Sequence, residues 1–324
     1  MDIKTINSVK EYVEAICELN RNRNDLLNEE FLFRGQSNVK WKLEPSLVRL
    51  RSDSKGLVHS DATCLKDELS LIEMAKYKLP EIFKNDMLPL DVLALLQHHL
   101  VPTRLLDLTE NALVALYFAC EIILKEKKKP GDKEPDGEVF VFHQYDSDIA
   151  TYPIIQAIAD SSHLIRSNKY PLDFFFQSAS NMPYFASQRI VYDICFSEKN
   201  KNKSSKNKSP FMSMEDILSG ICHKPIFVYA PIRTMRQKTQ SGRYLLFPNR
   251  IHESASFNCK VFDDELVSLE KDDPCIACRF TISGEAKQSI LDDLNTLGIC
   301  REILFWDNID VVCQEIKKTI SLRQ

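Results

Sequence analysis

Residues 95–120 place six polar or charged side chains inside a stretch that is otherwise mostly apolar. An unpaired polar group among buried apolar residues costs roughly 1–3 kcal/mol, and an unpaired charge costs more. The side chains therefore either satisfy one another as a buried polar network or surround a ligand. They are Gln97, His98, Thr103, Arg104, Asp107 and Thr109.

The composition is that of a globular protein. Of the 324 residues, 44% are hydrophobic and 27% are charged, and the formal net charge is -4. This charge argues against a dominant phosphate-binding surface, although a local basic groove remains open. No stretch reaches the apolar length of a membrane span, and the N-terminal residues lack the pattern of a signal peptide. We therefore expect a cytoplasmic protein without a membrane partner.

The ten cysteines are scattered through apolar segments, which is typical of reduced, buried thiols in a chain of this length. Cys275 and Cys278 have the Cys-x-x-Cys spacing. They lack a second pair or a nearby histidine, and the Ile-Ala between them suits a strand better than a metal knuckle. The sequence therefore predicts no metal site.

The hydrophobic pattern predicts one mixed α+β domain. Residues 1–27 are expected to form an N-terminal helical segment and residues 28–324 the domain, with a flexible insertion at 197–210. That insertion is rich in Lys, Asn and Ser. It could instead tether nucleic acid, but it has no aromatic residues between its lysines.

Periodicity predicts the individual elements. Ser8 and Glu11 form a capping box for the first helix, and Thr109 or Asn111 is expected to cap the central one. The seventy residues after 142 are the least readable. Helices are predicted at 8–20, 61–79, 90–99, 113–124, 284–298 and 308–320, and strands at 31–34, 103–108, 138–142, 226–230, 243–247, 275–282 and 303–306.

Arg34 is the clearest candidate for holding an anion. The eight glycines form neither a Gly-x-Gly-x-x-Gly motif nor a phosphate loop, so side chains must hold any nucleotide. A guanidinium can place its fork against a pyrophosphate, and the neighbouring Gly35 would let the ligand approach the backbone. The alternative is a structural ion pair between Arg34 and Asp107.

Arg104 and Asp107 lie three residues apart, so a regular strand would point them to opposite faces. Asp107 could then orient His98 or pair with Arg34, while Arg104 would need an acceptor of its own. His98 is either a core histidine bonded to a carbonyl or a member of a site with its polar neighbours.

Several motifs, and their order along the chain, resemble those of the FRG-domain family, which takes its name from a Phe-Arg-Gly tripeptide. Phe33-Arg34-Gly35 supplies the tripeptide, and residues 95–120 resemble the central signature. Residues 43–49, 136–142 and 236–244 resemble three further motifs, the last being Gln-x-Gly-aromatic. Three positions depart from the family: Leu100 stands where Gly is usual, Leu108 where Trp is favoured, and Ala112 where Pro is favoured.

The order of these motifs also resembles that of ADP-ribosyltransferases. The resemblance implies that Arg34 holds NAD, that Thr103 supports it, and that the motif around Gln240 takes the catalytic place of a late glutamate. Because Gln240 carries no charge, Asp107 is the best candidate for the acid, with Glu253 a distant one. The implied sets are Asp107, His98 and Gln240 as catalytic residues, and Arg34, Gln36, Gln97, Thr103, Arg104 and Thr109 as ligand-binding residues.

Two functions remain open. The first is an ADP-ribosyltransferase-like effector that consumes NAD and modifies a protein or nucleic acid, as the toxin of a phage-defence or toxin–antitoxin system with an antitoxin or defence partner. The second is a non-catalytic module that binds a nucleotide or nucleic-acid end through Arg34 and Arg104. Asp107 near Arg34 across a cleft would favour the enzyme, and a closed pair without a cavity would favour a structural role.

Overall fold

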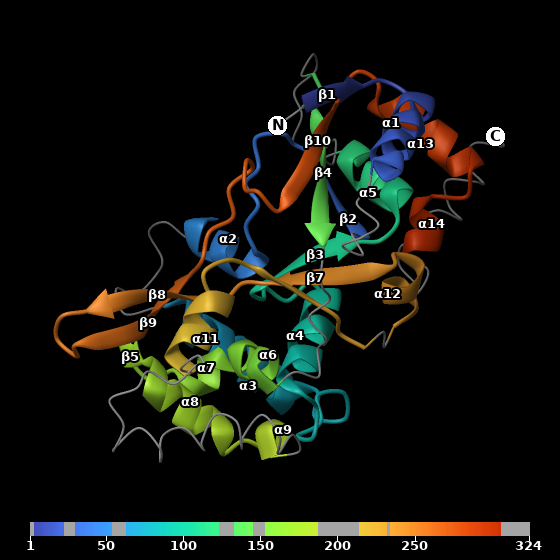
Figure 1. Ribbon diagram of the computed structural model, residues 1–324. Coiled ribbons are helices and arrows are strands. Elements are labelled where there is room, and N and C mark those ends of the chain that lie inside the picture. The colour runs from blue at the N-terminus through green and yellow to red at the C-terminus, as the bar shows by residue number, and fades with distance from the viewer. Residues whose placement is uncertain are drawn as a thin grey trace.

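A seven-stranded sheet in the order β1-β10-β4-β2-β3-β7-β6 runs through the molecule (Figure 1). The computed structural model describes residues 3–22, 30–53, 63–122, 133–144, 153–186, 214–231 and 234–305. Apart from β1, which is parallel to β10, the neighbouring strands are antiparallel. The strands of this sheet are β1 (Ile3–Ile6), β2 (Glu30–Gln36), β3 (Leu105–Thr109), β4 (Gly137–Gln144), β6 (Ile226–Val228), β7 (Gly242–Leu246) and β10 (Ile276–Ile282).

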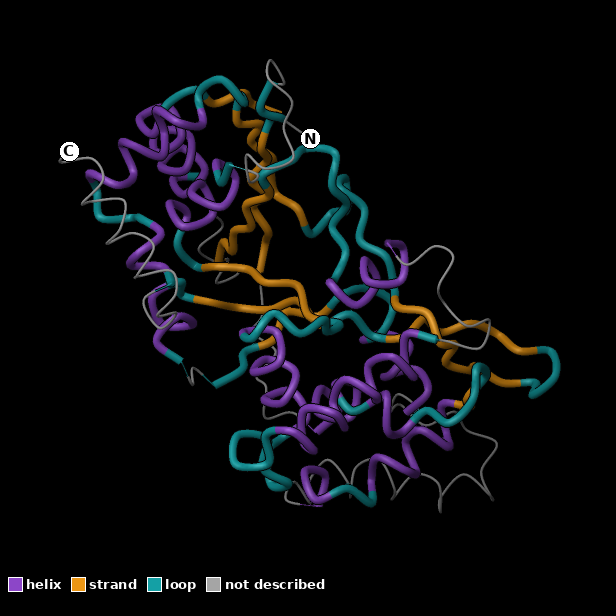
Figure 2. The backbone as a smooth tube through the Cα atoms, turned by 180° about the vertical axis from the view of Figure 1, so that it is seen from behind, coloured by secondary structure: helices purple, strands orange, loops and turns teal. Residues whose placement is uncertain are grey.

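The sheet changes direction between β2 and β3. These two strands pair at a single position, Phe33 with Thr109, whereas β2 pairs with β4 along its whole length. Figures 1 and 2 both show β3 and β7 running across the direction of β4 and β10. The two halves of the sheet therefore diverge just after Phe33, which leaves space beside Arg34.

Helices cover the two halves separately. In Figure 1, α1, α5 and α13 flank the upper strands, while most of the other helices lie beneath β3 and β7. A small sheet, in the order β5-β9-β8, extends to the side (Figure 1). Its strands are β5 (Tyr170–Pro171), β8 (Asn249–Ser254) and β9 (Cys259–Leu266).

Three of the helices begin at side-chain caps. Ser8 accepts from the Glu11 amide at the start of α1, Thr63 accepts from Lys66 before α3, and Asn111 caps α5. The helices are α1 (Val9–Arg21), α2 (Ser46–Asp53), α3 (Cys64–Lys78), α4 (Pro89–His98), α5 (Ala112–Cys120), α6 (Pro153–Ala159), α7 (Ser161–Leu164), α8 (Leu172–Ser180), α9 (Pro183–Ala186), α11 (Met214–Ile221), α12 (Met235–Thr239), α13 (Lys287–Thr296) and α14 (Arg301–Leu304).

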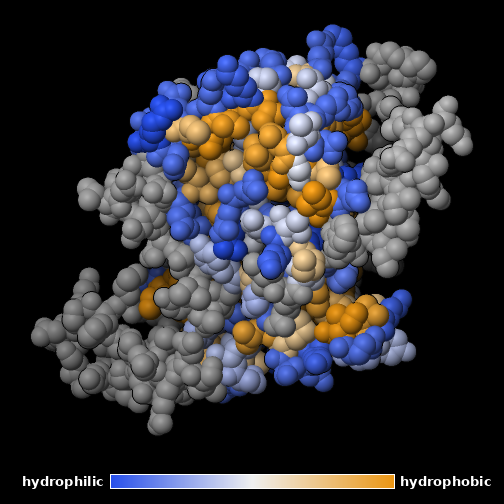
Figure 3. All heavy atoms as spheres, turned by 90° about the vertical axis from the view of Figure 1, so that its right-hand side faces the viewer, coloured by the Kyte–Doolittle hydropathy of each residue, from blue (hydrophilic) through white to orange (hydrophobic). Residues whose placement is uncertain are grey.

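Successive side chains along a strand point to opposite faces of the sheet, so the core is divided into separate clusters. Val139 and Val141 of β4 pack with α1, α5 and α13, whereas Phe140 and Phe142 of the same strand face the opposite cluster, which includes Leu47 of α2. A third cluster fills the space among α3, α4, α6 and α8. In Figure 3, apolar side chains gather in the upper half of the face shown, where Figure 1 places α1, α5 and α13.

Gly35 allows α5 to lie directly on the sheet. A Cβ atom built on Gly35 would lie 1.9 Å from the carbonyl oxygen of Ala115, and one on Gly137 would lie 2.1 Å from that of Ala119. Both obstructing atoms belong to helix backbone, which cannot rotate away. The glycine of the tripeptide is therefore required for packing. The approach of a ligand to its backbone, which the sequence suggested, stays a prediction.

We expect Gly35→Ala to destabilise the fold by about 1–3 kcal/mol or more, the usual cost of forcing extra volume into a packed core. Chemical denaturation followed by circular dichroism would measure the loss. Gly220→Ala is the matched control because nothing lies within 4 Å of a Cβ at Gly220. Equal free energies of unfolding for the two variants would contradict this account of Gly35.

Most predicted elements are confirmed, with bounds shifted by a few residues, and the α+β class is confirmed. The strand expected at 303–306 is wrong, because residues 301–304 form α14. The strand at Phe31 does not end before Gly35 but continues to Gln36. The sequence missed β8 and β9. The insertion at 197–210 and the helix at 308–320 lie outside the described residues.

The N-terminal segment joins the main fold. Its strand β1 pairs with β10, and Val9, Tyr12 and Ala15 of α1 are buried in the cluster around α5. Tyr12 also donates from its hydroxyl to the carbonyl of Ala112, at 3.0 Å. None of the helices within the described residues has the length and apolar character to cross a membrane.

Candidate functional site

A pocket of about 370 Å³ opens where β2 and β3 diverge. Its size falls within the range of small-molecule sites. Side chains and backbone from β2, α2, α4, β3, α5, α12 and β7 line it. The lining residues with polar side chains are Arg34, Ser46, Arg49, Gln97, His98, Asp107, Thr109, Arg236, Gln237, Gln240 and Tyr244.

Arg34 reaches across the gap between the diverging strands. Its Nη1 donates to the backbone carbonyl of Asp107, at 2.6 Å, where β3 has no ladder partner on β2. The buried Nε has no hydrogen-bond partner among the described residues. Burial and the charge of Arg49 lower the pKa of Arg34 to about 10, against the opposing effect of Asp107. Arg34 therefore stays cationic at neutral pH.

Asp107 accepts the last bond of a polarised chain. The Leu105 amide donates to Thr103 Oγ1, Thr103 donates to Gln97 Oε1 at 2.7 Å, and Gln97 Nε2 donates to Asp107 Oδ2 at 2.7 Å. Each bond polarises the next, so the chain strengthens the hydrogen bond that the Asp107 side chain accepts. Asp107 itself is exposed to the pocket, whereas Thr103 is fully buried. Thr103 therefore acts through Gln97.

Two further cations face the same space. Arg49 of α2 donates to the Glu44 carbonyl at 2.6 Å. Arg236 of α12 donates to the His98 carbonyl at 3.2 Å and stacks on Phe305, with its guanidinium carbon 4.6 Å from the ring centre. Among the described residues that line this pocket, Asp107 is the one with a carboxylate. Three guanidiniums against one carboxylate make the pocket attractive to anions.

His98 ends α4 at the wall of the pocket. Its Nδ1 lies 3.3 Å from the hydroxyl of Thr234, which caps α12. The His98 ring meets that of His99 edge-on, with centroids 4.8 Å apart. These contacts fix the ring where α4 meets α12.

In the motif of residues 236–244, Gln240 makes structural hydrogen bonds at the edge of the pocket. Gln240 donates from its side-chain Nε2 to the Leu304 carbonyl at 3.1 Å. The backbone carbonyl of Gln240 accepts from the Thr109 hydroxyl at 2.6 Å. Thr109 also accepts from the Asn111 amide, at 3.0 Å. Both residues line the pocket, but their hydrogen bonds hold the turn before β7 against the end of β3.

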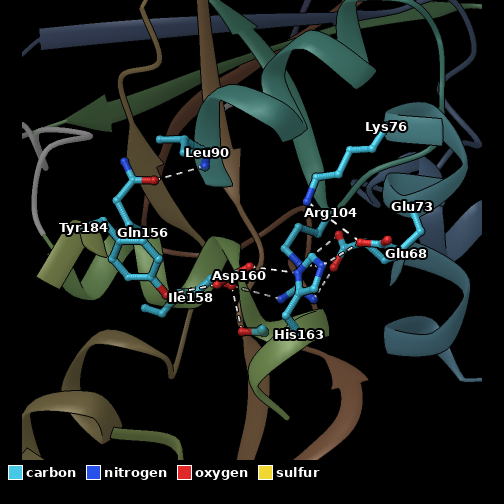
Figure 4. A network of polar contacts seen from close by, with 11 residues as sticks. Glu68, Glu73, Lys76, Leu90, Arg104, Gln156, Ile158, Asp160, His163 and Tyr184 are labelled. Atoms are coloured by element: carbon cyan, nitrogen blue, oxygen red, sulfur yellow. Dashed lines mark hydrogen bonds and ion pairs between the residues drawn. The ribbon is translucent and has the colours of Figure 1, made fainter. Parts of the chain in front are cut away.

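Arg104 does not line this pocket. It is fully buried and bonds both carboxylate oxygens of Glu68, at 2.6–3.0 Å, in the network of Figure 4. Its Nη1 also donates to Asn249 Oδ1 at 2.9 Å. The predicted ligand-binding role of Arg104 is therefore replaced by a structural one, because Glu68 satisfies the charge that the sequence left without an acceptor.

Gln36 lies beyond the pocket, on the same face of β2 as Arg34. It is buried and donates from Nε2 to the Lys42 carbonyl at 3.2 Å. The pocket brings together six of the residues that the sequence proposed for the site: Arg34, Gln97, His98, Asp107, Thr109 and Gln240. Within the described residues, no group of three or more His, Cys, Asp or Glu side chains could hold a metal ion.

Sequence reasoning missed five residues whose polar side chains line the pocket: Ser46, Arg49, Arg236, Gln237 and Tyr244. Arg49 and Arg236 lie inside the two motifs of residues 43–49 and 236–244, and their charge was the available signal. Gln237 and Tyr244 join each other by a hydrogen bond of 2.9 Å. Burial, with the charge of Asp107, raises the pKa of Tyr244 to about 12, so its hydroxyl keeps its proton at neutral pH.

Comparison with known families matches residues 29–128 to the FRG domain. The matching range begins just before β2 and includes α5, and the resemblance predicted from the sequence is confirmed over these residues. Neither the curated proteins nor the solved structures gave a match.

Proposed function

We propose that the pocket binds NAD and that the protein is an ADP-ribosyltransferase-like effector, which transfers ADP-ribose to a protein or nucleic acid. One observation carries the proposal: three guanidiniums and one exposed carboxylate surround the same pocket. Arg34 bonds the backbone of Asp107 and not its carboxylate, so the two charges face the pocket together.

The residues have separate roles in this proposal. Arg34, with Arg49 and Arg236 around it, binds the pyrophosphate. The bond between the ribose C1′ and the nicotinamide nitrogen breaks, and its electron pair leaves with nicotinamide. Asp107 stabilises the oxocarbenium-like ribose that results. A nucleophile of the target then attacks C1′ and gives its proton to water.

A non-catalytic nucleotide-binding module is the second candidate. It is favoured by the bond from Gln97 Nε2, which already occupies one oxygen of the Asp107 carboxylate. A binding module would keep the arginine contacts and report occupancy to a partner, such as an antitoxin or another defence protein, without cleaving the ligand. The two candidates therefore share a ligand and differ in turnover.

Incubation with labelled NAD separates these candidates. The protein is mixed with NAD labelled in its adenylate part and with total cell protein, RNA or DNA. Transfer of label to one of these fractions, with release of nicotinamide, supports the transferase. Binding of NAD by calorimetry without release of nicotinamide supports the module. If NAD neither binds nor reacts, the proposal is wrong.

We expect Arg34→Ala to weaken NAD binding about 100-fold, because a charge-assisted fork to the pyrophosphate contributes about 1.5–3 kcal/mol. Stability should fall by only about 1 kcal/mol, the value of its single bond to the Asp107 carbonyl. Calorimetry and chemical denaturation measure the two effects. Arg250→Ala is the control, since Arg250 forms an exposed ion pair with Asp263 away from this pocket. A loss of several kcal/mol of stability with unchanged NAD affinity would make Arg34 structural.

A further inference from the structure

A second pocket, of about 590 Å³, adjoins the first. The two share Arg34, Gly35, Arg49 and Phe118 as a common wall. The rest of the second pocket is formed mainly by the end of β2 and the segment between β2 and α2, which together contribute Gln36, Ser37, Lys40, Trp41, Lys42 and Glu44. Arg34 and Arg49 therefore stand between two spaces, each large enough for part of a ligand.

Hydrogen bonds from distant parts of the chain hold this segment in place. Lys287 donates to the Ser37 carbonyl at 2.6 Å, and Lys271 donates to the Val39 carbonyl at 2.6 Å. The Val39 amide donates to the Asp136 carbonyl at 2.8 Å. Lys271 is itself held by the fully buried Glu138. The shape of the second pocket is thus fixed before any ligand arrives.

Trp41 presents an indole at the edge of this fixed segment. It is 47% exposed, although its neighbours Leu43 and Leu47 are completely buried. Single exposed apolar residues are common on protein surfaces. Here the exposed aromatic ring lies beside the cations Arg34, Arg49 and Lys40, in one pocket. An aromatic platform next to positive charge is the combination that binds a base and its phosphates.

The acidic residues of the second pocket leave this positive charge in place. Lys42 pairs with Glu44 at 3.5 Å, so these two neutralise each other. Burial raises the pKa of Glu121, while Arg301 and Arg236 oppose the shift. The pocket as a whole therefore remains suited to an anion.

We propose that the second pocket binds the non-reacting nucleoside of a dinucleotide. Its base stacks on Trp41, and the pyrophosphate lies at the shared wall between Arg34 and Arg49. The reacting ribose then lies in the first pocket, beside Asp107. This inference rests on the proposed function and specifies its substrate class: a dinucleotide spans both pockets, whereas a mononucleotide occupies only one.

Three ligands test the inference by calorimetry on the full chain: NAD, AMP and nicotinamide mononucleotide. Trp41→Ala should weaken NAD and AMP roughly tenfold or more, the value of one stacked base. It should leave nicotinamide mononucleotide unchanged, because that ligand binds in the first pocket. Trp41→Phe should restore most of the affinity. Phe257→Ala removes another half-exposed aromatic, outside both pockets, and should change nothing.

Fluorescence provides a second measurement that needs no turnover. In a Trp306→Phe variant, Trp41 is the one remaining tryptophan, and AMP should quench its emission if the base stacks on it. Equal NAD affinity in wild type and Trp41→Ala, or equal weakening of all three ligands, would overturn the second pocket while leaving the NAD proposal intact. If none of the three ligands binds the wild type, the proposed function fails and this inference fails with it.

Discussion

Asp107→Asn is expected to lower the rate of NAD cleavage by two or more orders of magnitude, a loss of about 2.7 kcal/mol or more in transition-state stabilisation. Asparagine keeps the size of the side chain, and its oxygen can still accept from Gln97 Nε2. The variant removes only the negative charge that faces the pocket. The fold should be unaffected, because Asp107 is exposed.

Single-turnover cleavage of NAD by folded, monodisperse protein would measure this effect. Glu110→Gln is the matched control: Glu110 is close to Asp107 in the chain but pairs with Arg243 outside the lining of the pocket. Gln240→Ala should reduce the rate less than Asp107→Asn, since the Gln240 amide donates to the Leu304 carbonyl. Wild-type activity in Asp107→Asn together with an inactive Gln240→Ala would contradict this role of Asp107. It would assign the catalytic role to the motif of residues 236–244.

Local patterns in the sequence predicted the elements that carry the pocket. The aromatic run before Arg34, the buried strand before Thr109 and the helix capped by Asn111 all have clear signals, and each was found. Of the six polar side chains in residues 95–120, Thr103, Gln97 and Asp107 form one hydrogen-bonded chain. Four of the six line one pocket.

The sequence could not show which of these six polar side chains line the pocket and which are structural. Arg104 follows directly after Thr103, yet it bonds Glu68 of α3 and Asn249, which lies 145 residues further along the chain. Such long-range partners leave no local pattern. The direction of Arg34 was open for the same reason: only the divergence of β2 from β3 brings it to the carbonyl of Asp107.

The regions missed by sequence reasoning are those whose structure depends on tertiary packing. The hairpin of β8 and β9 has consecutive exposed polar residues such as His252 and Glu253 in place of a clear alternation, and its pairing shifts register near Asn249. Residues 303–306 are all apolar, which is why the sequence predicted a strand there. Residues 301–304 form a turn of helix instead, and the next residue, Phe305, lies against Arg236 and Phe118.

Glu68→Ala is expected to destabilise the protein by about 3–5 kcal/mol, because it leaves the fully buried guanidinium of Arg104 without its counter-charge. Arg104 connects the start of β3 to three other elements, through Glu68 of α3, Ile158 of α6 and Asn249 of β8. Loss of the carboxylate should therefore loosen the helices beneath β3 together (Figure 4).

Chemical denaturation followed by circular dichroism would measure the free energy of unfolding. Glu14→Ala removes one partner of an exposed pair with Lys10 and should cost less than about 0.5 kcal/mol. The double variant Glu68→Leu with Arg104→Met should recover much of the lost stability, since apolar side chains often replace a buried ion pair without penalty. NAD affinity of the folded double variant should match the wild type, because neither residue lines the pocket. Unchanged stability together with lost NAD binding in Arg104→Met alone would return Arg104 to the ligand-binding role that the sequence first suggested.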